Sequence, residues 1–587
     1  CNGTGRTHNT SSSSIFNICS TCNGTKIISE LNKSQTKVAY FFKRKFYFHK
    51  KPLQILALPE PETIILTSDF ARDRGSDVAL IDESRSVTWT DLNDRVNRLV
   101  NGLRDLGLTT GDTVAVVAGN QCEWFEIAQA CAHGGWTYVP VNWHWVADEL
   151  AYVFNDAQAK VVLVDARYEG PVAEAMKDER SQSVQHVVGI QCGPKAAVRS
   201  YAHFLEFEAL IAGASDAEPT DQMLGGPMFY TSGTTGRPKG VRGALSGGMA
   251  LTPDIMKLIA AGFSSFLPIP GRTMLCGPFY HSAQWAFSFF PMVGGSSVVM
   301  QHKYDSAEML RLIDEHACTN VHLVPTQMKR LLDLPQSVKD TFEGAAMSTV
   351  WHGAAPCPPA VKHGLIEWWG PKITEYYGST EGSIISTVSS QEWLDKGGSV
   401  GKPLDSVEVL VLNDANERVE QGSEGTLYFR NKMGTDFSYH NDEGKTKDAH
   451  LEPGVFTTGD VGYIDTDGYL WLSDRKIDMI ISGGVNIYPA EIEGVIAVHP
   501  GVEDVAVIGV PDEEFGESVK ALVQVEEGVA ESAELAAAII ARCRELLAGY
   551  KAPRSVDFIA HIPRTGTGKI QKKPLRAPYW EGHSRKI

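Results

Sequence analysis

The sequence has no run of about 18 apolar residues, which is the length that a membrane-spanning helix needs. It also has no excess of positive charge, because 54 Lys and Arg residues stand against 71 Asp and Glu residues and give a net charge of −17. An acidic chain has no general electrostatic attraction to nucleic acid or to an anionic membrane. We therefore expect neither a nucleic-acid partner nor an integral membrane segment.

Closely spaced cysteines are equally scarce. Among the ten cysteines only Cys19 and Cys22 form a close pair, and no second pair or histidine pair completes a metal site with them. Most of the others stand among apolar or small neighbours, as reduced core cysteines do. This use of cysteine indicates a cytoplasmic protein.

Residues 1–57 differ in composition from the rest of the chain. They are rich in Asn, Ser, Thr and Lys, and they lack the continuous apolar core of a secretory signal. We expect them to form a disordered or non-native extension.

From about Leu58 onward the sequence has the pattern of a compact α/β domain. A helix that begins at a Thr90 cap and a second helix over 121–135 alternate with apolar segments. Such alternation is typical of parallel sheets with helices on their faces. The apolar segments predict strands at 78–82, 87–89, 113–119, 137–141 and 160–165.

A loop rich in hydroxyl groups and glycine spans Phe229–Gly243, FYTSGTTGRPKGVRG. Its small residues leave backbone N–H groups open to wrap a phosphate, and Lys239 adds a positive charge at its end. The spacing excludes a Walker-type loop, because Pro238 stands where the second glycine would fall and Gly240 follows the lysine. The loop therefore predicts a phosphate cradle of another type.

Three later segments carry further candidates for a nucleotide site. TVWHGAAPCPP at 349–359 ends a strand in small residues, which let a flat ring approach the backbone. ITEYYGSTEG at 373–382 offers an aromatic pair, two hydroxyls and a carboxylate, and Mg²⁺ prefers one or two carboxylates together with substrate phosphates. FTTGDVGYIDTDG at 456–468 holds Asp460 in a tight turn, where a carboxylate can accept hydrogen bonds from both ribose hydroxyls.

The last hundred residues predict a small α+β domain. Strands at 502–510 and 519–525 precede a helix that Ser532 caps. The segment IPRTGTGKIQKKPLR at 562–576 then forms a glycine-containing turn that presents Lys569. On its own, that residue would be taken for a surface lysine in a basic tail.

Together these segments resemble the motifs of the adenylate-forming (AMP-binding) superfamily, and within it the acyl-CoA synthetase or fatty-acid–CoA ligase type. The resemblance implies an α/β fold, in which a large N-terminal domain of parallel sheets with helices and a distorted barrel is followed by a small mobile α+β domain. The implied adenylation domain is 58–474, and the implied C-terminal domain with the catalytic lysine is 475–587.

The resemblance also implies roles for individual residues. Glu381 would hold Mg²⁺, Tyr377 would stack on adenine, and Asp460 would bind the ribose. The implied catalytic residues are Lys569, Glu381, Thr380 and His281, the last in the wall of the carboxylate pocket. The implied ATP-binding residues are Thr231, Ser232, Gly233, Thr234, Thr235, Gly236, Lys239, Gly353, Ala354, Ala355, Tyr377, Gly378, Ser379, Asp460 and Arg475.

The implied reaction has two halves. A carboxylic acid, for which the family resemblance favours a fatty acid, attacks ATP to give an acyl-adenylate and pyrophosphate, and coenzyme A then takes the acyl group and releases AMP. ATP, Mg²⁺ and coenzyme A are the implied cofactors. Ile477 occupies the implied hinge, where many members carry Asp or Lys.

Other functions share these motifs. An adenylating enzyme could load a carrier protein, a luciferase-like monooxygenase could oxidise its adenylate, and a module without catalysis could simply bind ATP. The aromatic segment 279–290 favours an apolar acyl group, but fatty, aryl and bulkier ring acids all stay open.

Overall fold

The computed structural model describes residues 67–190, 204–219, 223–231, 238–243, 262, 264, 266–355, 357–475, 478–482, 485–512, 515–547, 549–564 and 570–581. All of these residues lie in one compact unit that spans 63–587. The predicted extension at 1–57 lies outside them.

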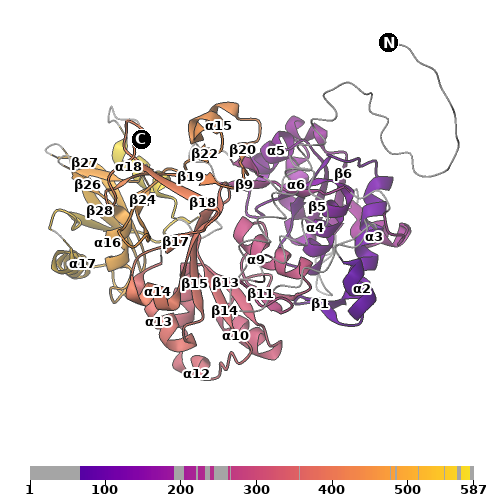
Figure 1. Cartoon of the computed structure of the whole chain (residues 1–587), viewed down its shortest axis with the longest axis horizontal. Helices are drawn as coiled ribbons and strands as arrows, with labels where there is room; N and C mark the ends of the chain where they lie inside the picture. The colour runs from indigo at the N-terminus through magenta and orange to yellow at the C-terminus, as the bar shows by residue number, and fades with distance from the viewer. Residues whose placement is uncertain are drawn as a thin grey trace, which may run out of the picture. The chain divides into compact units, whose positions relative to one another are not determined.

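The first sheet has six parallel strands in the order β7-β6-β5-β3-β4-β8. Figure 1 labels its strands β5 and β6 beside helices α4, α5 and α6. Parallel neighbours need crossover connections, and helices supply them here. The strands are β3 (Thr113–Val117), β4 (Thr137–Pro140), β5 (Ala159–Asp165), β6 (His186–Ile190), β7 (Leu205–Glu206) and β8 (Gly226–Pro227). The helices are α4 (Cys122–Gly134), α5 (Ala147–Asp156), η1 (Ala166–Tyr168), α6 (Glu169–Ala175), η2 (Glu179–Ser183) and α7 (Phe207–Gly213).

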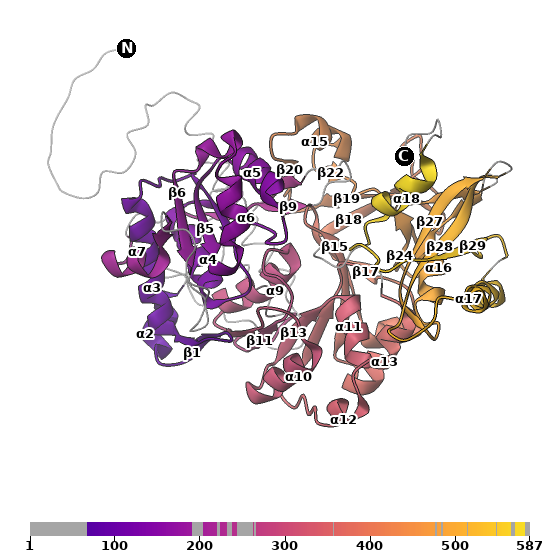
Figure 2. The ribbon, with the colours of Figure 1, turned by 180° about the vertical axis from the view of Figure 1, so that it is seen from behind.

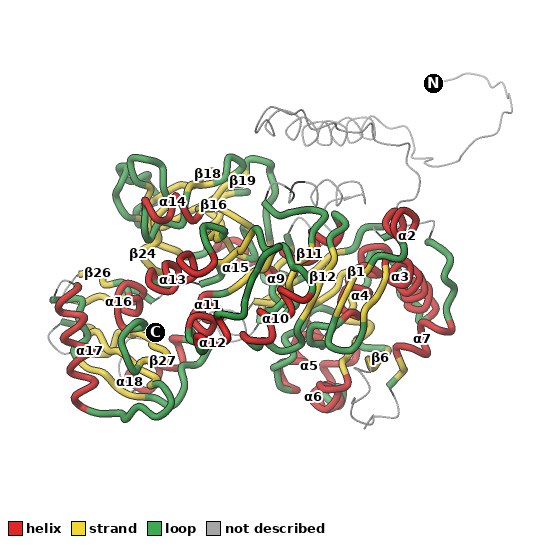
Figure 3. The backbone as a smooth tube through the Cα atoms, turned by 90° about the horizontal axis from the view of Figure 1, so that it is seen from below, coloured by secondary structure: helices red, strands yellow, loops and turns green. Residues whose placement is uncertain are grey.

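The second sheet has nine strands in the order β17-β16-β15-β14-β13-β11-β12-β1-β2. Its six inner strands from β15 to β1 run parallel, and antiparallel strands close both edges. Figure 3 shows β11, β12 and β1 side by side in this sheet. The strands are β1 (Val78–Ile81), β2 (Ser86–Thr88), β11 (Arg272–Leu275), β12 (Ser297–Met300), β13 (Asn320–Leu323), β14 (Thr349–His352), β15 (Ile373–Ser379), β16 (Ser383–Ser389) and β17 (Lys402–Pro403).

Helices connect the parallel strands of this sheet as well. The connection from β11 to β12 is the aromatic helix α9, and α13 connects β14 to β15. The helices of this part are α2 (Ser68–Arg74), α3 (Trp89–Asp105), α9 (Ser282–Val293), α10 (Ser306–Glu315), α11 (Pro325–Leu332), α12 (Gln336–Lys339), α13 (Pro359–Trp369) and α14 (Ser390–Asp395).

The main core lies between the two sheets. All thirteen residues of α4 are buried, which is the pattern of a helix covered on every side. One apolar cluster joins α3, α4 and α9 with strands of both sheets. Trp124 of α4 donates its indole N–H to the Ala118 carbonyl at 3.0 Å, so the polar atom of this buried ring is satisfied.

The start of α3 corrects one prediction from the sequence. The cap is Thr88 and not Thr90, because the Thr88 hydroxyl oxygen accepts the backbone N–H of Asp91 at 3.1 Å. Strand β2 therefore runs directly into the helix, and Trp89 is its first residue instead of the last residue of a strand.

Two sheets of antiparallel strands complete this part, and most of their strands follow β17 in the chain. They are a three-stranded sheet, β20-β10-β9, and a six-stranded sheet, β21-β22-β19-β23-β24 with β18 on β19. Their bounds are β9 (Phe229–Thr231), β10 (Lys239–Arg242), β18 (Val407–Leu412), β19 (Gly425–Asn431), β20 (Ser438–Tyr439), β21 (His450–Glu452), β22 (Val455–Phe456), β23 (Asp460–Ile464) and β24 (Leu470–Arg475), with helix α15 (Glu443–Ala449).

The C-terminal part is a five-stranded sheet with three helices (Figure 2). The predicted Ser532 cap is confirmed, since its hydroxyl accepts the backbone N–H of Leu535. This part follows a larger one built on parallel sheets, which confirms the predicted fold class. The elements are β25 (Ile480–Ser482), β26 (Val485–Ile487), α16 (Pro489–Ile496), β27 (Val502–Asp512), β28 (Gly516–Val525), α17 (Ala533–Leu546), β29 (Ser555–Phe558) and α18 (Lys572–Trp580).

Candidate active site

The carboxyl ends of three parallel strands bring the candidate residues to one edge of the nine-stranded sheet. Strand β14 ends before Gly353, β15 ends before Thr380, and the segment after β11 leads to His281. Open α/β sheets bind ligands at this edge. The hydroxyl oxygens of Thr380 and Ser282 lie 3.0 Å apart, so the start of α9 contacts the loop after β15.

The turn Gly353–Ala355 is shaped by close contact with the next strand. A Cβ atom on Gly353 would lie 2.6 Å from the ring of Tyr376, so the backbone can come this near only with glycine. Ala354 has a left-handed φ of 69°, which is rare for a residue with a side chain. Small residues thus let the backbone of this turn pack closely against the sheet, which leaves room for a flat ligand to lie against the backbone.

The turn around Glu381 is equally tight. A Cβ atom on Gly378 would lie 2.1 Å from the carbonyl oxygen of Ser383, and the Ser379 hydroxyl accepts the backbone N–H of Gly382 at 2.9 Å. The carboxylate of Glu381 accepts the hydroxyl of Tyr439 at 3.1 Å. The hairpin from β15 to β16 therefore presents Thr380 and Glu381 at its tip.

Tyr439 is a site residue that the motifs did not reveal. It lies on β20, which pairs with β10, so its ring also lies 5.3 Å from the ammonium group of Lys239. Burial lowers the pKa of the Lys239 ammonium group, and the positive charge of nearby Lys445 lowers it further. A short strand outside every motif thus connects Lys239 of the phosphate loop with Glu381.

The two ends of the phosphate loop lie opposite each other. Strand β9 pairs with β10 in antiparallel register, which sets Thr231 against Lys239. The predicted residues between them, Ser232, Gly233, Thr234, Thr235 and Gly236, lie outside the described residues. The hairpin fixes where the loop starts and ends.

Asp460 is held by two hydroxyl groups. Its Oδ2 accepts the hydroxyls of Tyr377 and Thr458, each at 2.6 Å. The register of β23 with β24 also sets Asp460 against Arg475. The residues predicted for the adenine ring and for the ribose are therefore neighbours, although they lie about eighty residues apart in sequence.

His281 stands immediately before α9, where its carbonyl accepts the backbone N–H of Trp285. Its ring centroid lies 4.3 Å from that of Tyr280. The next residue, Ser282, is the one that contacts Thr380. The predicted carboxylate-pocket histidine therefore lies one residue from the contact between α9 and the loop after β15.

Two predicted residues of the C-terminal half, Ile477 and Lys569, lie outside the described residues. The ends of the segment that carries Lys569 are described: Arg564 pairs with Ile570 in an isolated bridge, and the Gln571 N–H bonds to the Pro563 carbonyl at 2.8 Å. Arg564 also forms an ion pair with Asp504 at 2.6 Å. The base of the lysine loop is therefore closed by defined contacts.

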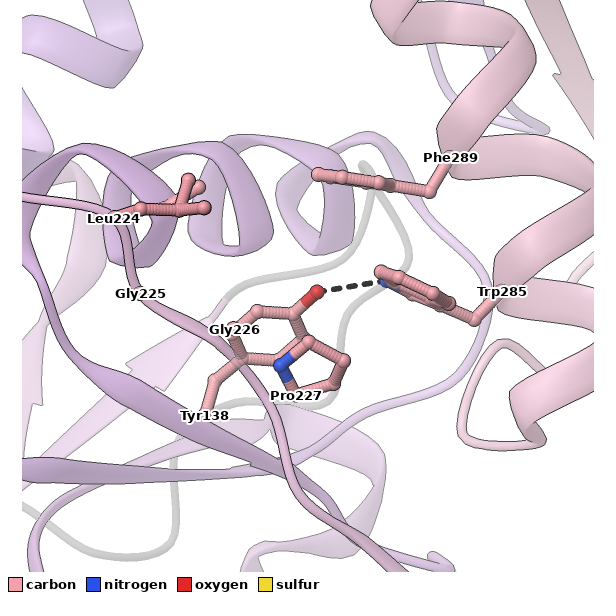
Figure 4. Close-up of a pocket in the computed structure, with 8 residues that line it drawn as sticks. Tyr138, Leu224, Gly225, Gly226, Pro227, Trp285 and Phe289 are labelled. Carbon is pink, nitrogen blue, oxygen red and sulfur yellow. Dashed lines mark hydrogen bonds between the residues drawn. The ribbon is translucent and has the colours of Figure 1, made fainter. Parts of the chain in front are cut away.

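A small apolar cavity lies away from these residues (Figure 4). It holds about 10 Å³, which is roughly the room that one water molecule needs. Trp285 donates its indole N–H to the hydroxyl of Tyr138 at 2.7 Å beside it. None of the predicted site residues that the structure describes lines this cavity. Its lining consists of Ala132, Tyr138, Leu224, Gly225, Gly226, Pro227, Trp285 and Phe289.

Glu381 fits a magnesium ion that is shared with a nucleotide. No group of three or more His, Cys, Asp and Glu side chains within the described part of the chain could hold a metal ion. A single carboxylate at the end of a turn, beside the base of a phosphate loop, suits an ion whose other ligands are phosphates and water.

In the described part of the chain, no helix is both long and apolar enough to cross a membrane.

Comparison with known proteins gives two family matches. Residues 68–435 match the family "AMP-binding enzyme", and residues 491–569 match "AMP-binding enzyme C-terminal domain". The medium/long-chain-fatty-acid–CoA ligase FadD8 of Mycobacterium tuberculosis is 30% identical over 547 residues, which are 91% of this chain and 93% of that protein.

Solved structures share the fold. The anthranilate CoA ligase AuaEII in complex with anthranoyl-AMP matches with a TM-score of 0.77 at 24% identity, over 88% of this chain and 96% of that one. The o-succinylbenzoate coenzyme A synthetase MenE of Bacillus subtilis, in complex with ATP and a magnesium ion, matches with a TM-score of 0.72 at 26% identity, over 88% and 99% of the two chains.

Proposed function

The chain belongs to the family of AMP-binding enzymes, and on this premise we propose that it joins a carboxylic acid to coenzyme A through an acyl-adenylate. The family confirms the resemblance found in the sequence, and the similarity to acyl-CoA ligases confirms the class of enzyme, an AMP-forming acid–thiol ligase. Two sets of contacts support the residue roles. Tyr439 contacts both Glu381 and Lys239. Thr380, the neighbour of Glu381, contacts Ser282 at the start of α9.

The nucleotide is held at the adenosine end by Tyr377 and Asp460. The Tyr377 ring stacks on the adenine, and its hydroxyl fixes the carboxylate that accepts the ribose hydroxyls. The turn at Gly353–Ala355 covers one face of the adenine. Thr458 holds the same carboxylate from the other strand end. Arg475, opposite Asp460 in the sheet, adds a positive charge near the ribose.

The phosphates extend from there toward the phosphate loop. The loop between Thr231 and Lys239 wraps the β- and γ-phosphates with backbone N–H groups, and Lys239 opposes their charge. Glu381 is the carboxylate that would hold Mg²⁺, which when bound neutralises phosphate charge. Tyr439 keeps Glu381 in position through its hydrogen bond.

In the first half-reaction an oxygen of the acid attacks the α-phosphorus and pyrophosphate leaves. The chain contributes by positioning and by stabilising the charge that grows on the phosphate oxygens. Thr380 lies at the α-phosphate, and Lys569 approaches with the C-terminal domain and neutralises the carboxylate. In the second half-reaction the coenzyme A thiol loses its proton to solvent and its sulfur attacks the acyl carbon, and AMP leaves with the electron pair of the broken bond.

The proposed compartment is the cytoplasm. The six described cysteines carry free thiols, and five of them are buried. Burial raises the pKa of several of these thiols, for example that of Cys276 to about 12, so they stay protonated and inert.

A thioesterification screen tests the proposal. The full chain is incubated with ATP, Mg²⁺ and a panel of carboxylic acids, with coenzyme A or a phosphopantetheinylated carrier protein as acceptor. We expect acyl-CoA, AMP and pyrophosphate, and fatty acids are the first acids to test because the named relative acts on them. Turnover with the carrier protein but not with coenzyme A would show that the acceptor is a carrier protein. Oxygen consumption or light emission with a luciferin would show a monooxygenase instead of a ligase.

A further inference from the structure

A second lysine stands beside Lys239 at the base of the phosphate loop. It is Lys445 on α15, the short helix that follows β20 and is drawn next to it in Figures 1 and 2. Its charge is near enough to lower the pKa of Lys239, in addition to the larger effect of burial. Two ammonium groups are therefore held together where the β- and γ-phosphates are proposed to bind.

Tyr439 holds α15 against the hairpin that carries Lys239. Its strand β20 pairs with β10 in antiparallel register. The backbone N–H of Tyr439 donates to the hydroxyl oxygen of Thr446 at 2.9 Å, and that hydroxyl donates to the carbonyl of Asp442 at 2.8 Å. Since Lys445 is the residue before Thr446, the same hydrogen bonds fix the point from which its side chain extends.

The two lysines share one nearby carboxylate that the proposed function does not use. Asp442 is engaged with Lys445, because its Oδ2 pairs with the ammonium group at 2.9 Å and its Oδ1 accepts the backbone N–H at 3.0 Å. Lys239 faces the ring of Tyr439 at 5.3 Å. Glu381 accepts the Tyr439 hydroxyl, and its charge is assigned to Mg²⁺. Like charges held this close repel each other, and an anion between them relieves the repulsion.

The exposure of Lys445 suits a ligand better than a structural role. Its side chain is 37% exposed, and that of its partner Asp442 is 31% exposed. Ion pairs this exposed add little to stability, so stability does not account for a second cation beside Lys239. An ammonium group has three N–H donors, which is enough to keep the carboxylate and to add a phosphate oxygen. Phosphate oxygens are strong acceptors for such charge-assisted hydrogen bonds.

We propose that Lys445 is a further phosphate-binding residue, which together with Lys239 binds the β- and γ-phosphates of ATP and the pyrophosphate that leaves. In this role Asp442 orients Lys445 and does not touch the nucleotide itself. The inference rests on the proposed function and deepens it, because it adds to the phosphate site a residue about two hundred positions beyond the phosphate loop.

Binding of three ligands separates this role from a structural one. Isothermal titration calorimetry on the full chain, without an acid, measures the Kd of ATP with Mg²⁺, of pyrophosphate with Mg²⁺, and of AMP. AMP occupies the adenosine end but lacks the β- and γ-phosphates, so its Kd reports general damage to the site.

Four variants of α15 and its cap are compared with wild type. Lys445→Met removes the charge, and Lys445→Arg keeps it. Asp442→Asn removes the partner charge, and asparagine still caps a helix. Lys447→Met is the matched control, because it removes an exposed lysine from the same helix.

We expect Lys445→Met to raise the Kd of ATP and of pyrophosphate about tenfold, which is the loss of one hydrogen bond to a charged group. The Kd of AMP should stay within about twofold of wild type. Lys445→Arg should keep most of the affinity for all three ligands. Asp442→Asn should bind ATP as tightly as wild type or more tightly, because Lys445 keeps its charge and loses a competing partner. Lys447→Met should behave as wild type.

Three outcomes overturn the inference and leave the proposed function intact. The first is a Lys445→Met chain that binds ATP and pyrophosphate as Lys447→Met does. The second is an Asp442→Asn chain that loses as much affinity for ATP as Lys445→Met, which would assign the effect to the ion pair and not to the cation. The third is an equal loss of affinity for AMP and ATP in Lys445→Met.

Failure of the proposed function has a different signature. A wild type that forms no thioester and shows no acid-dependent exchange of pyrophosphate into ATP would overturn the proposed function itself, whatever the measured affinities are.

Discussion

The two faces of strand β15 differ in chemistry although their central residues are adjacent tyrosines. On one face Tyr377 donates its hydroxyl to the carboxylate of Asp460 in a part-buried, polar setting. On the other face Tyr376 lies among buried rings and takes a hydrogen bond from a neutral histidine. One strand thus separates a surface suited to a charged nucleotide from a surface suited to an apolar acyl group.

The difference follows from what each face contacts. The Tyr377 face meets antiparallel strands of the last part of the large domain, which supply Asp460 and Thr458. The Tyr376 face meets α9, which is the most aromatic helix in the described part of the chain and belongs to the parallel-sheet core. Under the proposed function, a nucleotide and an acid bound on the two faces would react at the strand end, where Thr380 and Glu381 lie.

The largest expected effect comes from Lys569, the proposed catalytic lysine. Lys569→Ala should lower acid-dependent exchange of pyrophosphate into ATP by about 100- to 1,000-fold, because it removes a charge that stabilises the transition state. Thioester formation from preformed acyl-adenylate should fall much less. The control is Lys573→Ala, an exposed lysine on α18 nearby in sequence. Equal losses in both half-reactions would contradict this division of labour.

Gly353→Ala probes the close packing of the turn after β14 against Tyr376. The added methyl group would meet the Tyr376 ring at 2.6 Å, and overpacking of this kind costs about 1–3 kcal/mol of unfolding free energy. The control Gly494→Ala adds a methyl group inside α16, where no atom lies within 4 Å. Urea unfolding measures the unfolding free energy of both variants. If the two variants were equally stable, the turn could shift to accommodate the added methyl group.

The buried face should also respond to pH. The pKa of His322 lies near 3 in the folded chain, against about 6.5 in an unfolded one. Only the unfolded state then gains a proton as the pH falls below about 6.5, so stability is lost at up to about 1.4 kcal/mol per pH unit until the folded pKa is reached. His322→Gln should reduce this slope in denaturant titrations between pH 6.5 and 4, and an unchanged slope would rule out His322 as its source.

The sequence predicted several strands of the parallel sheets and proposed the candidate residues from local patterns. Apolar runs of residues predicted strands such as β3 and β5. Glu381 and Asp460 were found because each lies within a short sequence motif. The Thr90 cap was wrong because two threonines of similar context stand near the start of α3, and only the hydrogen bond to Asp91 distinguishes Thr88.

Contacts between distant segments could not be predicted. Tyr439 reaches Glu381 through the pairing of β20 with β10, and no motif includes it. The packed rings of Phe287, His322, Trp351 and Tyr376 come from α9, β13, β14 and β15. The hydrogen bonds that join Gln284, His322 and Tyr376 exist only after the sheet has formed. The sequence shows only a pair of adjacent tyrosines. The orientation of β15 in the sheet was needed to see which partners Tyr376 and Tyr377 each contact.

The most direct test of this separation is a comparison of Michaelis constants in Tyr377→Phe and Tyr376→Leu. Tyr377→Phe removes a hydrogen bond to a carboxylate, so the KM for ATP should rise about tenfold while the order of acids stays that of wild type. Tyr376→Leu should change the order of acids and leave the KM for ATP within about twofold, the effect of a few tenths of a kcal/mol. If each variant moves both quantities together, β15 does not separate the nucleotide from the acid, and the account is wrong.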